Sequence, residues 1–168
     1  MLKKVAAIAA GLCLTASLAV SSFAVPELGW DRITIGDINR DGYIDSADYS
    51  LQQRYIMGNA TFTNEQKVAA DVNGDNAITP TDHTYLGNYI LGIAGTANVG
   101  TYYNIAYGDV ELDGDLTIGD YYFLQSYING QSGMSWKQLC AADIPQSGVR
   151  DGVINNADLQ VLADYLGI

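Results

Sequence analysis

The stretch GDINRDGYIDSADYSLQQRYIMG, residues 36–58, joins an acidic loop to an amphipathic segment. In the loop, four acidic or amide side chains lie two or four positions apart around Gly42, at Asp37, Asn39, Asp41 and Asp45. Such a cluster repels itself, so it needs a solvated turn, acid–base chemistry or a bound cation to explain it. In the segment that follows, apolar and aromatic residues recur with helical spacing up to Gly58, which predicts a helix after the loop.

The same pattern occurs four times along the chain. Residues 36–71 align without a gap with residues 108–143, at a constant offset of 72 positions. Within each half, a second acidic loop begins 34 residues after the first, so the loops start at Asp37, Asp71, Asp109 and Asp143. Four loops in one frame argue against an isolated solvated turn. They also argue against a single active site, whose carboxylates would need different environments and roles.

Counted from its first aspartate, each of the first three loops places oxygen donors at positions 1, 3, 5, 7, 9 and 12, as in an EF-hand calcium loop. The spacing suits calcium because this hard cation takes six to eight oxygens, and position 12 closes the shell from the first helical turn. Position 6 needs an unusual backbone angle, which Gly42 provides and Asn76 tolerates. Position 7 contributes its main-chain carbonyl, and the predicted ligands are Asp37, Asn39, Asp41, Tyr43, Asp45 and Asp48 in loop one; Asp71, Asn73, Asp75, Ala77, Thr79 and Asp82 in loop two; and Asp109, Glu111, Asp113, Asp115, Thr117 and Asp120 in loop three.

The fourth loop departs from this spacing. Asp143 and Asp151 are eight positions apart instead of four, and residues 144–150 fill the gap. The pattern then resumes, and the predicted ligands of this loop are Asp143, Asp151, Val153, Asn155 and Asp158. We expect cations in loops one and two first, next in loop three, and leave loop four open, so the prediction is two to four calcium ions per chain.

The expected fold is all-α, built from small calcium-loop–helix repeats, each half of an EF-hand. A helical pattern follows each loop, and shorter helices are predicted to open at Thr63 and at Ser135. No segment alternates well enough to predict a long strand. The expected organisation is a signal peptide at residues 1–24, a first module at 25–92, a linker at 93–107 and a second module at 108–168.

The first 24 residues have the pattern of a secretory signal peptide. Two lysines precede an apolar run of about 16 residues, and small residues allow cleavage after Ala24. The run is short for a membrane-spanning helix, and Leu12 before Cys13 suits a lipobox poorly, so an uncleaved anchor and a lipoprotein are the weaker alternatives. Cleavage would leave a net charge of about −13. This charge argues against nucleic acid as a partner, and the leader predicts a secreted protein without a membrane anchor.

No catalytic constellation is visible in the sequence. His83 is the one histidine, and we expect it at the surface or in a partner contact. Cys140 is the one cysteine after the leader, so no internal disulfide can form, and its apolar neighbours predict a buried thiol. No nucleophile–base pair or glycine-rich phosphate loop is present, so we expect the protein not to be an enzyme.

Residues 36–92 resemble a type I dockerin, the calcium-binding module of cellulosomal proteins, and residues 108–167 resemble one more weakly. Three features carry the resemblance. Asp, not Glu, stands at position 12; each loop is followed by a helix but lacks a full incoming helix; and two such units form a module of about 60 residues. The longer fourth loop is the departure from the pattern.

The resemblance implies a non-catalytic module that binds cohesins in a calcium-dependent way during cellulosome assembly for plant polysaccharide degradation. In the family, cohesin contact centres on loop positions 10 and 11 and on helix positions near 17 and 18. The corresponding residues here are Ser46, Ala47, Gln53 and Arg54 in unit one; Pro80, Thr81, Gly87 and Asn88 in unit two; and Ile118, Gly119, Gln125 and Ser126 in unit three. The two halves of module one differ at these positions, which argues against two-way symmetric binding.

The leading hypothesis is an extracellular double-dockerin adaptor, monomeric when unbound, that is held at a cellulosome or cell surface by cohesin modules. The alternative is a free-standing extracellular calcium-binding protein with a different partner. A glycoside hydrolase fragment is a weaker third reading, because the repeats leave no room for a catalytic fold.

Overall fold

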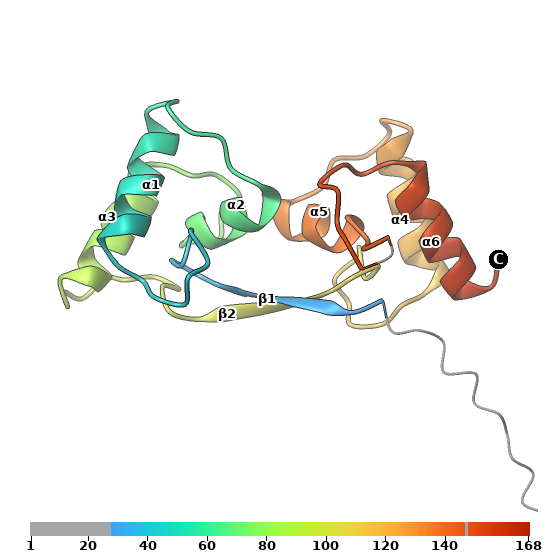
Figure 1. The fold of residues 1–168 in the computed structure, drawn as a ribbon, viewed down its shortest axis with the longest axis horizontal. Coiled ribbons are helices and arrows are strands. Elements are labelled where there is room, and N and C mark those ends of the chain that lie inside the picture. The colour runs from blue at the N-terminus through green and yellow to red at the C-terminus, as the bar shows by residue number, and fades with distance from the viewer. Residues whose placement is uncertain (1–27, 147) are drawn as a thin grey trace, which may run out of the picture.

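The computed structural model describes residues 28–146 and 148–168, and the predicted signal peptide, residues 1–24, lies outside them. The described residues form a mostly helical fold of two lobes (Figure 1), as the repeat pattern predicted. Its elements are β1 (Trp30–Thr34), α1 (Ser46–Ile56), α2 (Asn64–Ala70), α3 (Pro80–Ile90), β2 (Tyr102–Ala106), α4 (Ile118–Ile128), α5 (Trp136–Ala142) and α6 (Asn156–Leu166).

Each of the four long helices begins where its acidic loop ends, because the loop supplies the helix cap. In α1, Asp45 at loop position 9 is the N-cap, and Asp48 at position 12 returns a hydrogen bond to the cap's main-chain N–H. The same reciprocal capping box opens α3, α4 and α6. The two short helices start after Thr63 and Ser135, as predicted.

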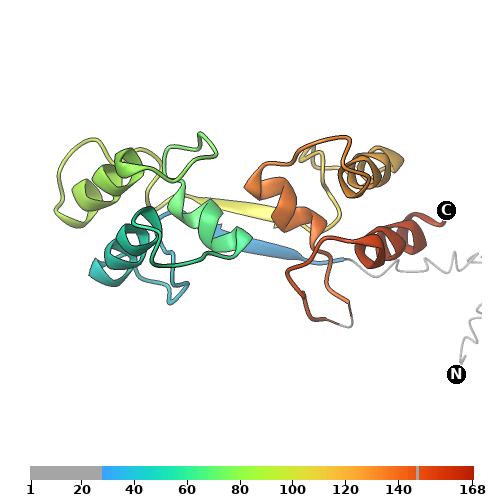
Figure 2. The same cartoon turned by 90° about the horizontal axis from the view of Figure 1, so that it is seen from above.

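The long helices pack in pairs at opposite ends of the molecule. Helix α1 packs against α3 in one lobe and α4 against α6 in the other, while α2 and α5 meet between the lobes (Figures 1 and 2). Each lobe has its own buried cluster. The first is centred on Ile38, Val72 and Leu86, and the second on Leu124 and Leu162.

A two-stranded antiparallel sheet runs beneath both lobes, and the sequence did not predict it. In the sheet, β1 pairs with β2 so that Arg32 lies opposite Asn104. These two residues are also 72 positions apart, the offset of the sequence repeat, and so are the starts of α2 and α5. The two halves therefore meet through equivalent elements around a pseudo-two-fold axis, as the subunits of a symmetric dimer do. The expected linker, residues 93–107, thus includes a strand of this shared sheet.

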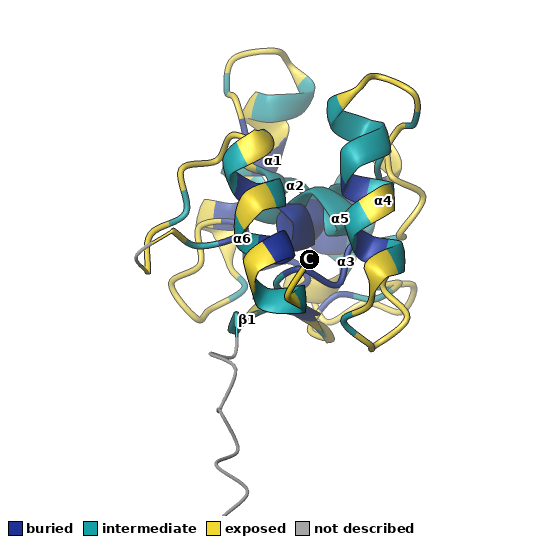
Figure 3. Ribbon diagram, turned by 90° about the vertical axis from the view of Figure 1, so that its right-hand side faces the viewer, coloured by how far each residue is buried: buried dark blue, intermediate teal, exposed yellow. Residues whose placement is uncertain are grey.

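The two halves also share their cores. Ile105, Cys140 and Ala141 belong to the second half by sequence, yet they are buried in the first cluster. In the opposite direction, Leu28 packs against the second cluster. Figure 3, in which the α4–α6 lobe faces the viewer, shows the buried segments gathered at the centre and the loop tips exposed. The pair of repeats, rather than one repeat, is therefore the unit that buries a complete core.

Candidate calcium-binding loops and helix faces

The aspartate at position 12 holds each loop against its helix. Asp48 is fully buried, and its Oδ1 accepts hydrogen bonds from the main-chain N–H groups of Ile38 (2.7 Å) and Asn39 (3.0 Å). Its Oδ2 accepts one from Asp45 N–H (3.0 Å). Asp82 and Asp120 are equally buried and hold loops two and three in the same way. Position 12 thus fixes the loop shape through both of its oxygens.

The aspartate at position 1 stabilises the turn of the loop by accepting hydrogen bonds from main-chain N–H groups at positions 5 and 6. Asp37 accepts hydrogen bonds from the N–H groups of Asp41 (3.1 Å) and Gly42 (3.0 Å), and Asp71 and Asp109 have equivalent partners. At position 6, Gly42 has φ +90° and Asn76 has φ +64°, so the predicted unusual angle is present. Sequence reasoning missed position 4, where Arg40 and Leu112 also have left-handed φ values (61° and 59°).

The loops keep carboxylates in places where water is scarce. Burial raises the pKa of Asp48, Asp71 and Asp109, and hydrogen bonds from main-chain N–H groups oppose this rise. Neighbouring aspartates raise the pKa of each further. Holding these groups charged at neutral pH therefore costs free energy, and a cation among them would remove that cost.

The donor chemistry of loops one to three fits calcium, because it consists of carboxylate, amide and carbonyl oxygens. Within the described residues, no three His, Cys, Asp or Glu side chains already lie close enough together to hold a metal. The side chains bond to one another and to the loop main chain instead; for example, the Asn39 amide donates to Asp41 Oδ2 (2.8 Å). The individual ligand assignments therefore stay predictions.

Loop four has the same helix cap but a different interior. Asp158 accepts hydrogen bonds from Ile144 N–H (2.9 Å) and Asn155 N–H (2.8 Å), as position 12 does in the other loops. Asp143, however, is paired with Arg150, whose Nη2 lies 3.1 Å from Asp143 Oδ2. Sequence reasoning missed Arg150, although it is the one basic residue within the inserted segment 144–150.

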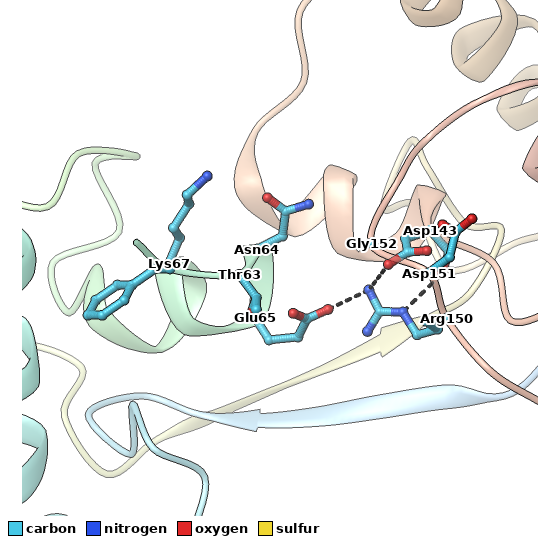
Figure 4. A pocket seen from close by; sticks show the side chains of 9 residues that line it. Thr63, Asn64, Glu65, Lys67, Asp143, Arg150, Asp151 and Gly152 are labelled. Carbon is cyan, nitrogen blue, oxygen red and sulfur yellow. Dashed lines mark hydrogen bonds and ion pairs between the residues drawn. The ribbon is translucent and has the colours of Figure 1, made fainter. Parts of the chain in front are cut away.

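Arg150 also crosses to the other half of the chain. Its Nη2 lies 2.5 Å from Glu65 Oε1 on α2, and its Nη1 lies 3.8 Å from Asp31 Oδ2 on β1. Figure 4 shows Glu65 and Asp143 directed at the guanidinium from opposite sides. These side chains line a hollow of about 570 Å³ between α2 and loop four. The inserted loop is therefore anchored to the first module.

The predicted partner-binding residues lie along the two outer helix pairs. On module one, Ser46, Ala47, Gln53, Arg54, Pro80 and Thr81 are exposed, and Gly87 and Asn88 are half-buried. On α4, Ile118 is exposed, and Gly119, Gln125 and Ser126 are half-buried. An apolar hollow of about 230 Å³ is lined by Ser46 and Tyr49 from the start of α1 and by Ile90 and Leu91 from the end of α3. The two helices are therefore antiparallel, and the exposed positions 10 and 11 of loops one and two lie at opposite ends of the pair.

The structure places His83 differently from the surface or partner role that we expected. Its ring is half-buried and stacks on Tyr49, with ring centroids 3.7 Å apart. Its Nδ1 lies 3.1 Å from Gln52 Oε1, and Gln52 in turn donates to Ala70 O (2.8 Å). The histidine therefore joins α3 to α1. Cys140 is buried as predicted, and burial raises the pKa of its thiol to about 12.

No helix in the described part of the chain is both long and apolar enough to span a bilayer. No curated protein sequence gives a significant match to this chain. The family model for the dockerin type I domain matches it twice, over residues 35–91 and 107–167, and no catalytic domain is detected. The two matches coincide with the two lobes and together cover more than half of the sequence. The chain therefore belongs to the dockerin type I family.

Proposed function

We propose that this protein is a calcium-dependent double-dockerin adaptor that binds one cohesin through each lobe and bridges two cohesin-bearing partners. A dockerin domain implies cohesin binding in cellulosome assembly. The finer proposal concerns the bridging, the residues that contact each cohesin and the ions that each loop holds.

The position of the two helix pairs is the observation that carries this proposal. The pairs α1–α3 and α4–α6 lie at opposite ends of the molecule, with the α2–α5 contact and the sheet between them (Figures 1 and 2). The α1–α3 pair exposes residues at loop positions 10 and 11, and the α4–α6 pair exposes position 10, where the family resemblance places cohesin contact. Two cohesins can then dock without competing for the same surface.

Dockerin type I domains typically bind calcium. In this chain, the oxygen donors of loops one to three would hold it, and the ion would supply positive charge among the buried aspartates. The carboxylates at position 12 also cap the helices. A filled loop therefore fixes the start of the helix that carries positions 10 and 11. This coupling explains why partner binding should require calcium.

Mixing the protein with an excess of cohesin in calcium tests the bridging. Light scattering should give the mass of one protein with two cohesins, and a chelator should release both. Because the cohesin type is not fixed by the sequence, a panel of cohesin types is needed. Complexes with one cohesin only would refute bridging. No binding to any cohesin in calcium would favour the alternative of a calcium-binding extracellular protein with another partner.

Matched variants assign the two faces. Ser46 and Ile118 are equivalent first residues of α1 and α4, and both are exposed. To cover both ends of each helix pair, Ser46→Arg is combined with Thr81→Arg at position 11 of loop two. Ile118→Arg is combined with Ala157→Arg, because Ala157 is the equivalent position 11 of loop four and directly precedes Asp158. Each double variant should lose one cohesin and keep the other, and the quadruple variant should lose both. Retention of two cohesins by either double variant would refute the assigned faces.

We also propose that the protein is secreted by its leader. Dockerin domains are extracellular cellulosome components, which agrees with this placement. Cleavage after Ala24 predicts a mature N-terminus at Val25, which N-terminal sequencing of the exported protein would check.

A further inference from the structure

We infer that Arg150 takes the place of calcium in the fourth loop, so that the chain binds three calcium ions and uses the fourth loop to join the two modules. This inference rests on the proposed calcium function of the other three loops. It is carried by the contacts of Arg150 and by two further features of loop four.

The first observation is the charge facing the position-1 carboxylate. Among the described residues, Asp143 is the one position-1 aspartate that forms an ion pair. Arg150 Nη2 lies 3.1 Å from its Oδ2, and Arg150 Nε donates to its main-chain carbonyl (3.0 Å). Both groups are shielded from solvent, since the side chain of Arg150 is 16% exposed and that of Asp143 is 4% exposed. A divalent cation bound here would lie beside the half-buried guanidinium and be repelled by it.

The second observation is the loss of ligands. Counted back from Asp151 at position 5, position 3 is occupied by Val149, which has no side-chain oxygen and is exposed. The position-7 carbonyl, that of Val153, accepts a hydrogen bond from the Asn155 amide (3.2 Å). Asp143 Oδ1 is buried without a hydrogen-bond partner, but its carboxylate is already held by Arg150. Loop four therefore has no side-chain donor at position 3 and has a paired carboxylate at position 1, so it offers fewer oxygens than the other loops to an ion that takes six to eight.

The third observation is the path of the backbone. In loops one and three, the residue at position 4 has a left-handed φ, at Arg40 and Leu112. Arg150 is at the same position but is not among the residues with positive φ. In the inserted segment, Gln146 and Val149 exchange main-chain hydrogen bonds (2.9 and 3.1 Å). Arg150 directly follows Val149, so the insertion changes the backbone path on which Arg150 lies.

The remaining contacts of the guanidinium explain what the arginine does in place of a metal. Arg150 bonds to Glu65 (2.5 Å) in the first module and to Cys140 O (3.2 Å) at the end of α5. It therefore ties loop four to the surface where α2 and α5 meet. A calcium ion held within the loop could not reach Glu65 in this way, and arginine can because its planar fork binds several acceptors at once.

A matched pair of variants in the second module tests the missing ion. Asp113 and Asp151 are both exposed at position 5, and each accepts one hydrogen bond, from the N–H of Asp115 (3.0 Å) and of Val153 (2.8 Å). Asparagine can keep both of these bonds. Calorimetric calcium titration of the full protein should give three ions. Asp113→Asn should weaken one step by about tenfold, and Asp151→Asn should leave all three within about twofold. A fourth ion that is lost in Asp151→Asn would overturn the inference.

A second pair of variants tests the tie between the modules. Arg150→Met removes the charge but keeps a long side chain, and Arg40→Met does the same to the exposed Arg40–Asp31 pair (2.7 Å) within module one. Labelling of the buried Cys140 thiol should become at least about tenfold faster in Arg150→Met than in Arg40→Met. Equal labelling rates would refute the tie. Both readouts are independent of cohesin, so failure of the bridging proposal would leave them unchanged.

Discussion

Replacing Ile105 with alanine tests whether the two modules unfold as one unit. Ile105 is on β2, in the second half of the chain, but it is 2% exposed and buried in the cluster of the first half. Ile33 is its equivalent on β1 and is 1% exposed in the same cluster. A shared core predicts that either substitution destabilises both lobes together.

The expected loss follows from the buried side chain. Isoleucine to alanine removes three carbon atoms, each worth about 0.8 kcal/mol in transfer free energy, and the cavity adds to this. We therefore expect the free energy of unfolding to fall by about 3 kcal/mol. For a cooperative unit of the size of the two lobes together, 1 kcal/mol lowers the Tm by about 2–4 °C, and for a module of about 60 residues by about 4–8 °C. One shared unit thus predicts a fall of about 6–12 °C, and independent modules a fall of about 12–24 °C in one transition.

Differential scanning calorimetry in saturating calcium measures this directly. The wild type, Ile33→Ala and Ile105→Ala should each show one transition, with similar shifts in the two variants. Leu162→Ala, in the second cluster away from the sheet, is the control for a core substitution in one lobe. Two resolved transitions, of which Ile105→Ala moves one, would contradict the shared core.

Three further measurements follow from the titrating groups. The raised pKa values of Asp48, Asp71 and Asp109 mean that the metal-free fold favours their neutral forms. The stability of the metal-free protein should therefore fall as the pH rises above about 4. Chemical denaturation of chelator-treated protein checks this, and stability that rises with pH in that range would contradict it. Burial lowers the pKa of His83, so the contribution of the neutral ring to stability is intact above about pH 6.5 and is lost as the pH falls below that value. In saturating calcium, the free energy of unfolding of the wild type should therefore fall more than that of His83→Gln between about pH 7.5 and 5.5. Equal losses would refute the argument. The Cys140 thiol, with a pKa of about 12, should not react with a thiol reagent at about pH 8 until denaturant is added, and rapid labelling of the native protein would show that α2 and α5 separate readily.

The helices could be predicted because their signals are local. Asp45 at position 9 caps α1, and Asp48 at position 12 closes loop one. Both lie within a few residues of the helix start, so these two positions predict both the loop and the helix. The same local chemistry opens the short helices at Thr63 and Ser135. Such elements need no distant partner. The sequence repeats the signal for a long helix four times and the signal for a short helix twice, which strengthens each prediction.

The sheet and the role of Arg150 could not be predicted in the same way, because both depend on distant parts of the chain. Strand β1 has five residues and is stable only when β2, about 70 positions later, lies beside it. The effect of Arg150 likewise depends on Glu65, which approaches it through packing of α2 against α5. In a sequence, Arg150 is one basic residue in an insertion, and nothing near it identifies an acidic partner in the other module.

The repeat itself carried a signal about the tertiary structure that spacing alone does not reveal. A 72-residue offset is equally consistent with two modules on a flexible linker and with two modules in a fixed arrangement. The structure favours the second arrangement. Arg32 pairs with its own equivalent, Asn104, and the neighbouring residues Ile33 and Ile105 are buried together in the first cluster. The two proposed binding faces, joined in this way, are held at a set separation. Each cohesin would then be placed relative to the other by the protein itself, rather than by the reach of a linker.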